Sequence, residues 1–455
     1  MRVSKRVLSY RISEESILLI NTLTGALDVV SPDIYHELSK LDTSGHLTID
    51  DFTRERLKRR GYIFDSIENE AQWIQRIKDA HTKTAKRLTF VVCPTYKCNL
   101  RCTYCFEGDL TNDSRNSMGI EDVEMIFSAI DKLSDEYKER RRTIELFGGE
   151  PLLPANKKII GLLFKEAQKR SIPVSIVTNG VFVTDYADIL ERYNDIVGSV
   201  QVTIDGPRDI HDLRRKSGSG KGSFDKIRTA IDRLLELRIK VHARTNVDVQ
   251  NIGHLHELLS FFTAKGWVDS PQFVCNLAPV EDHGCTRAYE FYMPQNLLVA
   301  KFYEEFKEHP EMAKVFQLNL FRTLRHINSV LSKSRPVLPL LHYCEANNFE
   351  HVVFGPDGYV YACTESMGDR KKAVGEFRPQ LKLYEDAVKM WGGRNVFRMK
   401  KCRECDIALL CGGGCAYSAL VVNGDINEPV CNNARETIFA YLDYIQAELV
   451  DKASA

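Results

Sequence analysis

The chain has 455 residues, with 62 Lys plus Arg and 62 Asp plus Glu, so its formal net charge is zero. This length exceeds one ordinary hydrophobic core and suggests several domains. The balanced charge gives no reason to expect nucleic acid as a partner. No segment has the apolar length of a membrane span or of a signal peptide, so we expect a cytoplasmic location and no membrane partner.

The first eighty residues show short strand patterns at 7–12, 17–21 and 26–30, followed by helical patterns at 32–41 and 49–59. A charged helix at 68–84 then leads into the next region. Three strands and two helices in so few residues predict a small winged-helix-like module. Such a module can bind a peptide by adding it as a strand to an exposed sheet edge. A structural cap or a dimerisation module is the alternative.

Thirteen cysteines are grouped along the chain, four of them at 93–105. In a long chain without an export signal, this grouping favours metal ligands over disulfides. Cys98, Cys102 and Cys105 are spaced by three and then two residues, with Tyr104 just before the last. A [4Fe–4S] cluster normally takes four thiolates, so three cysteines leave one iron open. A closed zinc site that also uses Cys93 is the alternative.

From residue 86 to 320, six strand patterns alternate with helical patterns, which predicts a parallel sheet with right-handed crossovers. The strands are expected at 88–92, 143–147, 174–178, 199–204, 241–247 and 272–275. Candidate binding residues collect at strand ends, where active groups gather in such folds. They are Gly148, Gly149, Glu150 and Pro151 after the second strand, Thr178 and Asn179 after the third, and Asp205 after the fourth; Arg244 lies on the fifth.

Three further features of this region are open to interpretation. Asp205 could serve only as a turn residue ahead of Gly206-Pro207. The glycine-containing segment 211–224 is interpreted as a mobile cover. Cys275 is expected to pack in the core, and Cys285 to be an ordinary thiol near the barrel mouth.

Seven cysteines follow a proline-containing stretch that we expect to be a linker at 321–340. Zinc ribbons also use pairs of cysteines, but they seldom need seven thiols. A helix is expected at 436–449. The seven are Cys344, Cys363, Cys402, Cys405, Cys411, Cys415 and Cys431.

The three-cysteine motif, the Gly-Gly-Glu-Pro motif and the seven later cysteines together resemble the radical S-adenosylmethionine (SAM) enzymes that carry a SPASM domain. The resemblance implies an α/β fold built on a partial (β/α)6 barrel at 85–320. It further implies a SPASM domain with two auxiliary clusters at 341–455. Separately, the order of strands and helices at the amino-terminal end is similar to PqqD-like leader-recognition elements, which implies such a module with its connecting helix at 1–84.

The resemblance also implies cofactors and their ligands. Cys98, Cys102 and Cys105 would hold the cluster that binds SAM, and three [4Fe–4S] clusters are expected in all. The SAM contacts would come from Tyr104, Gly148, Gly149, Glu150, Pro151, Thr178, Asn179, Asp205 and Arg244. Cys402, Cys405, Cys411 and Cys431 would hold the outer auxiliary cluster. Cys344, Cys363 and Cys415 would hold the inner one, which would expose one iron unless Glu345, Glu350 or another side chain supplies the last ligand. A thiolate of the substrate could bind such an open iron.

The expected function is modification of a ribosomally made precursor peptide that carries a leader, with a flavodoxin or ferredoxin as reductant. The preferred reaction joins a cysteine sulfur to a carbon of another residue as a thioether, because an open auxiliary iron could hold the substrate sulfur. Carbon–carbon crosslinking, sulfatase-type oxidation of Cys or Ser to formylglycine, and a non-catalytic iron–sulfur peptide-binding or electron-transfer protein are the alternatives. The sequence identifies no catalytic acid or base.

Overall fold

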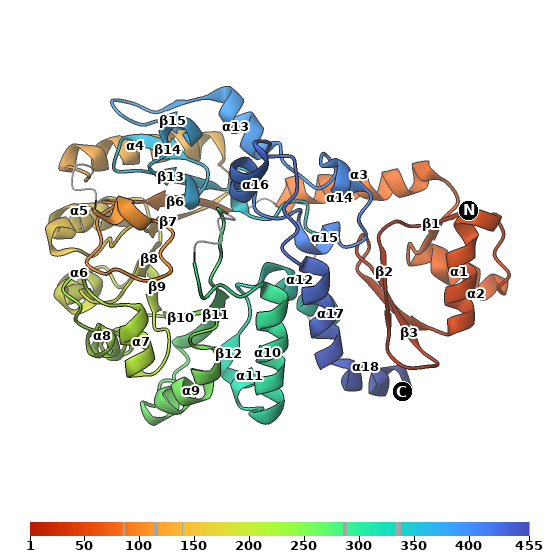
Figure 1. Ribbon diagram of the computed structural model, residues 1–455. Coiled ribbons are helices and arrows are strands. Elements are labelled where there is room, and N and C mark those ends of the chain that lie inside the picture. Colours follow the sequence, from red (N-terminus) through yellow and green to blue (C-terminus); the bar gives the residue numbers. More distant parts are fainter. Residues whose placement is uncertain (85–86, 113–116, 139, 285–288, 333–337, 455) are drawn as a thin grey trace.

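Figure 1 shows the computed structural model, which describes residues 1–84, 87–112, 117–138, 140–284, 289–332 and 338–454. A sheet flanked by helices occupies one end of the molecule, and the amino-terminal elements form the other end. The carboxy-terminal segment lies between and above them (Figure 1).

The amino-terminal elements follow the predicted order. Strands β2 (Val7–Arg11), β3 (Ile17–Asn21) and β4 (Ala26–Val30) form an antiparallel sheet, and helices α1 (Pro32–Ser44), α2 (Asp51–Arg59) and α3 (Ile67–Thr84) follow. Side-chain caps start the first two helices, because Ser31 accepts a hydrogen bond from the Ile34 amide and Asp50 accepts one from the Thr53 amide. Sequence reasoning missed the short antiparallel pairing of β1 (Arg2–Val3) with β5 (Ile63–Phe64).

Six parallel strands confirm the predicted barrel sheet, and they lie side by side in chain order. Buried apolar residues at helical spacing, such as Ile227, Ile231 and Leu234 of α8, attach the outer helices to this sheet. The strands are β6 (Arg87–Val92), β7 (Arg141–Leu146), β8 (Val174–Thr178), β9 (Val197–Thr203), β10 (Val241–Val247) and β11 (Phe273–Pro279). The helices between them are α4 (Ile120–Glu136), α5 (Lys157–Lys169), α6 (Ala187–Arg192), α7 (Arg208–Arg214), α8 (Phe224–Glu236) and α9 (Leu255–Ala264).

Further strands extend the barrel sheet at both edges. Beyond β11 lies β12 (Phe316–Gln317), which follows α10 (Gln295–Glu308) and α11 (Met312–Val315). At the opposite edge β13 (His351–Phe354) pairs in parallel with β6, and it continues antiparallel into β14 (Tyr359–Tyr361), β15 (Gly375–Glu376) and β16 (Lys382–Leu383). The carboxy-terminal strands therefore belong to one 11-stranded sheet with the barrel, which the sequence did not predict.

The expected linker at 321–340 is wrong in its first half, because α12 (Arg322–Ser332) occupies it. Leu324 and Ile327 of this helix are buried against the core. The linker was expected because prolines occur in this stretch, but Pro310 and Pro339 flank the helix and do not interrupt it.

The carboxy-terminal segment is built mainly from short helices. The single helix expected at 436–449 is two helices that meet at Ile445, and the first packs on α10, where the Tyr444 and Tyr303 rings stack with centroids 4.1 Å apart. These helices are α13 (Glu385–Gly392), α14 (Lys400–Arg403), α15 (Ala408–Cys411), α16 (Ala416–Asn423), α17 (Ala434–Tyr444) and α18 (Gln446–Ser454). No helix among the described residues combines the length and apolar character needed to cross a bilayer.

A buried arginine joins the amino-terminal elements to the cysteine-rich segment. The Arg6 guanidinium donates hydrogen bonds to the carbonyl oxygens of Cys402 (2.9 Å), Arg403 (2.7 Å) and Cys405 (2.5 Å). The Thr22 hydroxyl adds a 2.6 Å hydrogen bond to a carbonyl just beyond this turn. The loop that carries two cysteines is therefore braced from outside by the amino-terminal end of the chain.

We predict that Arg6→Met destabilises the reconstituted protein by about 2–4 kcal/mol, because it leaves three carbonyl groups without their donor. Arg11→Met is the matched control, since exposed Arg11 donates only a 3.3 Å hydrogen bond to the Glu14 carbonyl and should change stability little. Differential scanning calorimetry measures both. Equal losses in the two variants would contradict a bracing role for Arg6.

Candidate functional site

The loop with Cys98, Cys102 and Cys105 follows β6 and is held by the segment after α7. The Arg101 amide donates to the Lys216 carbonyl (2.8 Å) and the Thr103 amide donates to the Arg214 carbonyl (3.1 Å). The interpretation of segment 211–224 as a mobile cover is therefore wrong for its first part. Its first part is a buried support, in which the His211 and Arg214 side chains have no exposed surface.

Cys93 does not join the other three thiols. It is fully buried, and its Sγ donates to the carbonyl oxygen of Thr95 at 3.3 Å. Among the described residues, the single group of three metal-binding side chains with ligand atoms within 4.8 Å of one another contains no cysteine. Three thiols this far apart suit a multi-iron cluster better than one zinc ion.

A cavity of about 450 Å³ opens beside the three-cysteine loop. Cys98, Cys102 and Cys105 line one wall, and Cys344, Cys363 and Cys415 line another. Two cysteine sets that lie more than 230 residues apart in the sequence thus face a shared space. The candidate SAM contacts that also line it are Tyr104, Gly148, Gly149, Thr178, Asn179 and Arg244, whereas Glu150, Pro151 and Asp205 are not among the lining residues.

The Gly-Gly-Glu-Pro motif packs directly on the cysteine loop. A Cβ atom at Gly149 would lie 2.3 Å from the Tyr96 carbonyl oxygen and 2.2 Å from that of Lys97, so only glycine allows this approach. The Glu150 side chain is completely buried; Oε1 accepts hydrogen bonds from the Leu152 amide (2.8 Å) and the Thr178 hydroxyl (2.7 Å), and Oε2 accepts one from the Asn179 amide (2.7 Å). Glu150 thereby ties the ends of β7 and β8 together from behind the cavity wall.

Asp205 supports Tyr104 from behind the cavity. The Tyr104 hydroxyl donates to Asp205 Oδ2, and it accepts hydrogen bonds from Arg215 (2.5 Å) and from the Asn246 amide group (3.0 Å). Asp205 Oδ1 accepts from the backbone amide of Asn246 at 2.9 Å, which replaces the turn role considered for it. Burial raises the pKa of Tyr104, so the hydroxyl stays protonated and can donate.

Two buried arginines add positive charge beside the cysteine loop. Arg214 pairs with Asp248 at 2.5 Å, and its guanidinium carbon lies 4.9 Å from the centre of the Tyr104 ring. Burial raises the pKa of Cys102, and the neighbouring Arg215 acts against this rise. The arginines thus favour a thiolate at this position. Sequence reasoning missed their roles, because Asp248 lies 34 residues from Arg214 and Tyr104 lies 111 residues from Arg215.

Arg244 presents a charge to the cavity. Its Nε donates to Asn246 Oδ1 at 2.8 Å, and burial lowers the pKa of its guanidinium. Among the described residues, no carboxylate oxygen lies within 4.0 Å of this guanidinium. A carboxylate ligand in the cavity would therefore find an arginine that is not already paired.

Three acidic side chains in the cavity wall were missed by sequence reasoning. They are Glu107, Glu281 and Glu365. Burial raises the pKa of all three, to about 8 for Glu107, where nearby carboxylates contribute as well. Two of them had positions in the sequence that could have drawn attention to them, because Glu107 lies two residues after Cys105 and Glu365 lies two residues after Cys363.

The polar side chains considered as a fourth ligand for the inner cysteine set differ in whether they are free to bind. Glu345 lies next to Cys344 but its carboxylate approaches Arg322 at 3.4 Å, and Glu350 is absent from the described cavity lining. Burial raises the pKa of Cys415, but neighbouring His283 and Ser418 together outweigh burial, so the net change is a lower pKa. Cys285, two residues further, lies outside the described residues.

The four cysteines of the outer set lie close together. They are Cys402, Cys405, Cys411 and Cys431. Burial raises the pKa of Cys411 to about 12, and the other three thiols add to this rise. Three consecutive glycines with positive φ separate Cys411 from Cys415, which faces the cavity. A Cβ atom at Gly414 would lie 1.8 Å from the Val430 carbonyl oxygen. This tight crossing directs the two cysteines to different sets.

Comparisons with known proteins agree with this geometry. The radical SAM superfamily profile matches residues 92–262. A serine-type anaerobic sulfatase-maturating enzyme of Bacteroides thetaiotaomicron is 32% identical over 400 residues, which is 81% of this chain and 93% of that protein. The chain is a radical SAM enzyme. It belongs with the sulfatase-maturase and SPASM type. The motifs predicted the radical SAM and SPASM character, with sulfatase maturation only as an alternative.

Two solved structures share the fold of this radical SAM enzyme. Native anSMEcpe with bound AdoMet superposes with a TM-score of 0.62 at 20% identity, covering 81% of this chain and 99% of that one. Streptococcus suis SuiB bound to precursor peptide SuiA gives 0.56 at 16% identity, covering 94% and 98%. The predicted α/β barrel fold is confirmed.

The family implies SAM and a [4Fe–4S] cluster as cofactors, and the residues present fit them. Among the described residues, Cys98, Cys102 and Cys105 form a set that the neighbouring Cys93 does not join. The cavity volume lies within the range of about 300–1,000 Å³ that is usual for ligand sites. Arg244 adds an unpaired cation for a carboxylate.

We predict that Gly414→Ala lowers the iron content of the carboxy-terminal cysteine sets, because the added methyl group displaces the Val430 backbone between them. Gly424→Ala is the matched control. Gly424 also has a positive φ, but a Cβ atom there meets nothing within 4 Å, so only the backbone strain of about 1–2 kcal/mol applies. Iron analysis after reconstitution measures the effect, and retained iron in Gly414→Ala would contradict the assigned crossing.

We also predict that Asp205→Ala destabilises the protein by about 3–5 kcal/mol, because it leaves buried Arg214 and Arg215 with one carboxylate fewer. Tyr104→Phe keeps that carboxylate and should cost about 1 kcal/mol. Thermal unfolding of the reconstituted variants compares them. A larger effect from Tyr104→Phe would show that the tyrosine hydroxyl, not the carboxylate, holds this network together.

Proposed function

We propose that the chain is a maturase that modifies a ribosomally made precursor peptide by forming a thioether between a cysteine sulfur and a carbon of another residue. The cavity lined by both cysteine sets carries this proposal. A peptide segment in that cavity would touch the SAM-binding side and the inner cysteine set at the same time.

When bound, SAM and its cluster supply a 5′-deoxyadenosyl radical that removes a hydrogen atom from the substrate. We propose Cys98, Cys102 and Cys105 as the ligands of this cluster. Arg244 suits the SAM carboxylate, and Gly148, Gly149, Thr178 and Asn179 line the wall beside the cysteine loop. Glu150 and Asp205 act from behind this wall by fixing Asn179 and Tyr104, respectively.

The inner set supports a role for a substrate thiolate. We propose that Cys344, Cys363 and Cys415 hold one auxiliary cluster and that the outer four cysteines hold another. Arg322 already engages Glu345, and Glu350 does not line the cavity. We propose a thiolate from the peptide as the fourth ligand, because iron favours thiolate.

The amino-terminal module is proposed to bind the leader of the precursor. Its three-stranded sheet ends at β4, which pairs only with β3 among the described strands and exposes Val29. A leader strand could add to this edge by main-chain hydrogen bonds. In this division residues 1–84 recruit the peptide, and residues 85–320 and 341–455 provide the reaction site. A flavodoxin or ferredoxin supplies the electron.

Sulfatase-type maturation is the second candidate, and it is favoured by the 32% identity to a sulfatase-maturating enzyme. In that reaction a Cys or Ser side chain is oxidised to the aldehyde of formylglycine. The two candidates differ in product chemistry. A thioether retains the cysteine sulfur and has no aldehyde to react with a hydrazide, whereas formylglycine from cysteine has lost the sulfur and its aldehyde reacts.

The test uses the reconstituted enzyme with SAM, a reductant and a cysteine-containing peptide, with its leader, encoded beside the gene. We expect 5′-deoxyadenosine and a peptide that has lost two hydrogen atoms, with tandem mass spectrometry locating a sulfur–carbon bond. The Cys98/Cys102/Cys105→Ala variant should give neither product.

Cys344→Ala is the matched variant for the inner set. It should still cleave SAM but should fail to crosslink the peptide. A hydrazide-reactive product would establish the second candidate instead, and unchanged crosslinking by Cys344→Ala would remove the inner set from the proposal.

A further inference from the structure

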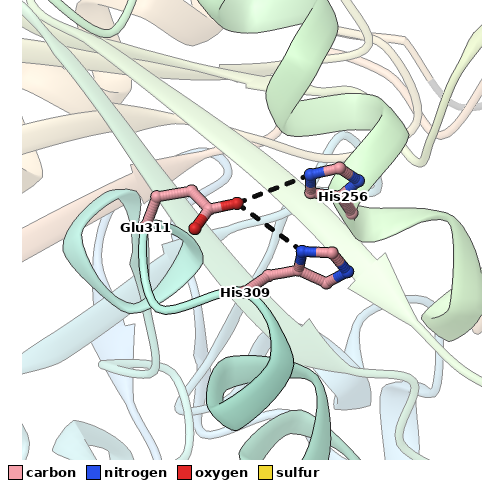
Figure 2. Close-up of side chains that lie close together, drawn as sticks. All are labelled: His256, His309 and Glu311. Atoms are coloured by element: carbon pink, nitrogen blue, oxygen red, sulfur yellow. Dashed lines mark ion pairs between the residues drawn. The ribbon is translucent and has the colours of Figure 1, made fainter.

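Two histidines and a glutamate converge on the outer surface of the barrel, away from the cavity. His256 lies on α9, His309 ends α10, and Glu311 lies between α10 and α11. Figure 2 shows that both imidazole rings direct a nitrogen at the Glu311 carboxylate. His256 Nε2 lies 3.4 Å and His309 Nδ1 lies 3.7 Å from the same oxygen, Oε1.

These separations are longer than hydrogen bonds to a carboxylate, which measure about 2.7–2.9 Å when the donor is charged. They match the spacing of ligands around one small metal ion. Metal–ligand bonds of about 2.0–2.1 Å in a tetrahedron place the ligand atoms about 3.4 Å apart. All three ligand atoms lie within 4.8 Å of one another, and among the described residues no other such group of three is found.

Packing and a tight turn hold the ligands close together. The His256 and His309 rings stack, with centroids 3.9 Å apart and an angle of 16° between their planes, so one ring turns about its Cβ–Cγ bond to point its in-plane lone pair at a shared ion. The Met312 amide donates to the His309 carbonyl at 3.0 Å, which closes the turn that carries Glu311. The side chains remain 35–53% exposed, so an ion can reach them from solvent.

We propose that His256, His309 and Glu311 bind one divalent transition-metal ion of the zinc class, with water in the remaining position. Two imidazole nitrogens and one carboxylate oxygen are a donor set that zinc accepts in proteins. None of these residues lines the cavity of the radical site. The ion would join α9 to the α10–α11 turn, and so fix the helices that follow the last two barrel strands, β10 and β11.

A nearby pair provides a comparison within the same surface. His254 Nδ1 lies 3.1 Å from Glu257 Oε1, which is a hydrogen-bond distance. The two residues are three positions apart at the start of α9. This pair is an ordinary His–Glu contact without a second histidine in metal-binding range. It therefore offers a matched control for histidine replacement.

The experiment uses the full-length protein with its iron–sulfur sites reconstituted, so that the cysteines are occupied. The protein is dialysed against zinc buffered by a chelator, and zinc per chain is measured by mass spectrometry. We expect the wild-type protein and His254→Asn to bind one zinc ion that the His256→Asn/His309→Asn variant lacks. Single replacements of His256 or His309 should weaken binding by about tenfold or more.

Thermal unfolding provides the second readout. Zinc should raise the midpoint of the wild-type protein and of His254→Asn, because ligand binding to the folded state stabilises it, but not that of the double variant. If the double variant does not fold, Glu311→Gln takes its place with the same expectation. Equal zinc content in wild type and variant, or equal loss in His254→Asn, would overturn the proposal.

Discussion

The pairing of β13 with β6 is the constraint on which the reaction site depends. Residues His351 to Phe354 align in parallel with Thr89 to Val92, so the carboxy-terminal strands continue the barrel sheet instead of forming a separate sheet. The three-cysteine loop follows β6, and Cys363 follows β14, the partner of β13. One set of main-chain hydrogen bonds thus brings two distant cysteine sets to the same cavity.

Buried charges then hold the reactive loop in place. Asp205, Arg214, Arg215 and Asp248 have little or no exposed surface, and Tyr104 lies among them as donor and acceptor. A buried ion is stabilised only when it is paired and hydrogen-bonded, so each group fixes its neighbours. The strand ends of β9 and β10 thereby determine where the cysteine loop lies. The glycines that follow β7 pack against the cysteine loop from its other side. A side chain would not fit there.

Local sequence pattern was enough to predict the barrel strands, the amino-terminal strands and helices, and the cysteines that gather into sets. It was not enough for contacts between distant segments. Nothing in the residues around Arg6 indicates that they meet the Cys402–Cys405 turn, and nothing near Asp205 indicates Tyr104 as a partner. The β13–β6 pair and the His256–His309–Glu311 group were missed for the same reason, because tertiary packing brings together residues that no short spacing relates. Helix α12 was missed because the prolines near it indicated a linker.

The account rests on a three-thiol cluster that faces the cavity and leaves one iron free for SAM. Electron paramagnetic resonance of the reduced, reconstituted protein, recorded with and without SAM, tests this most directly. The account predicts that one cluster signal changes on adding SAM, and that this signal is missing from the Cys98/Cys102/Cys105→Ala variant. Spectra of the wild-type protein that stay the same when SAM is added would contradict it.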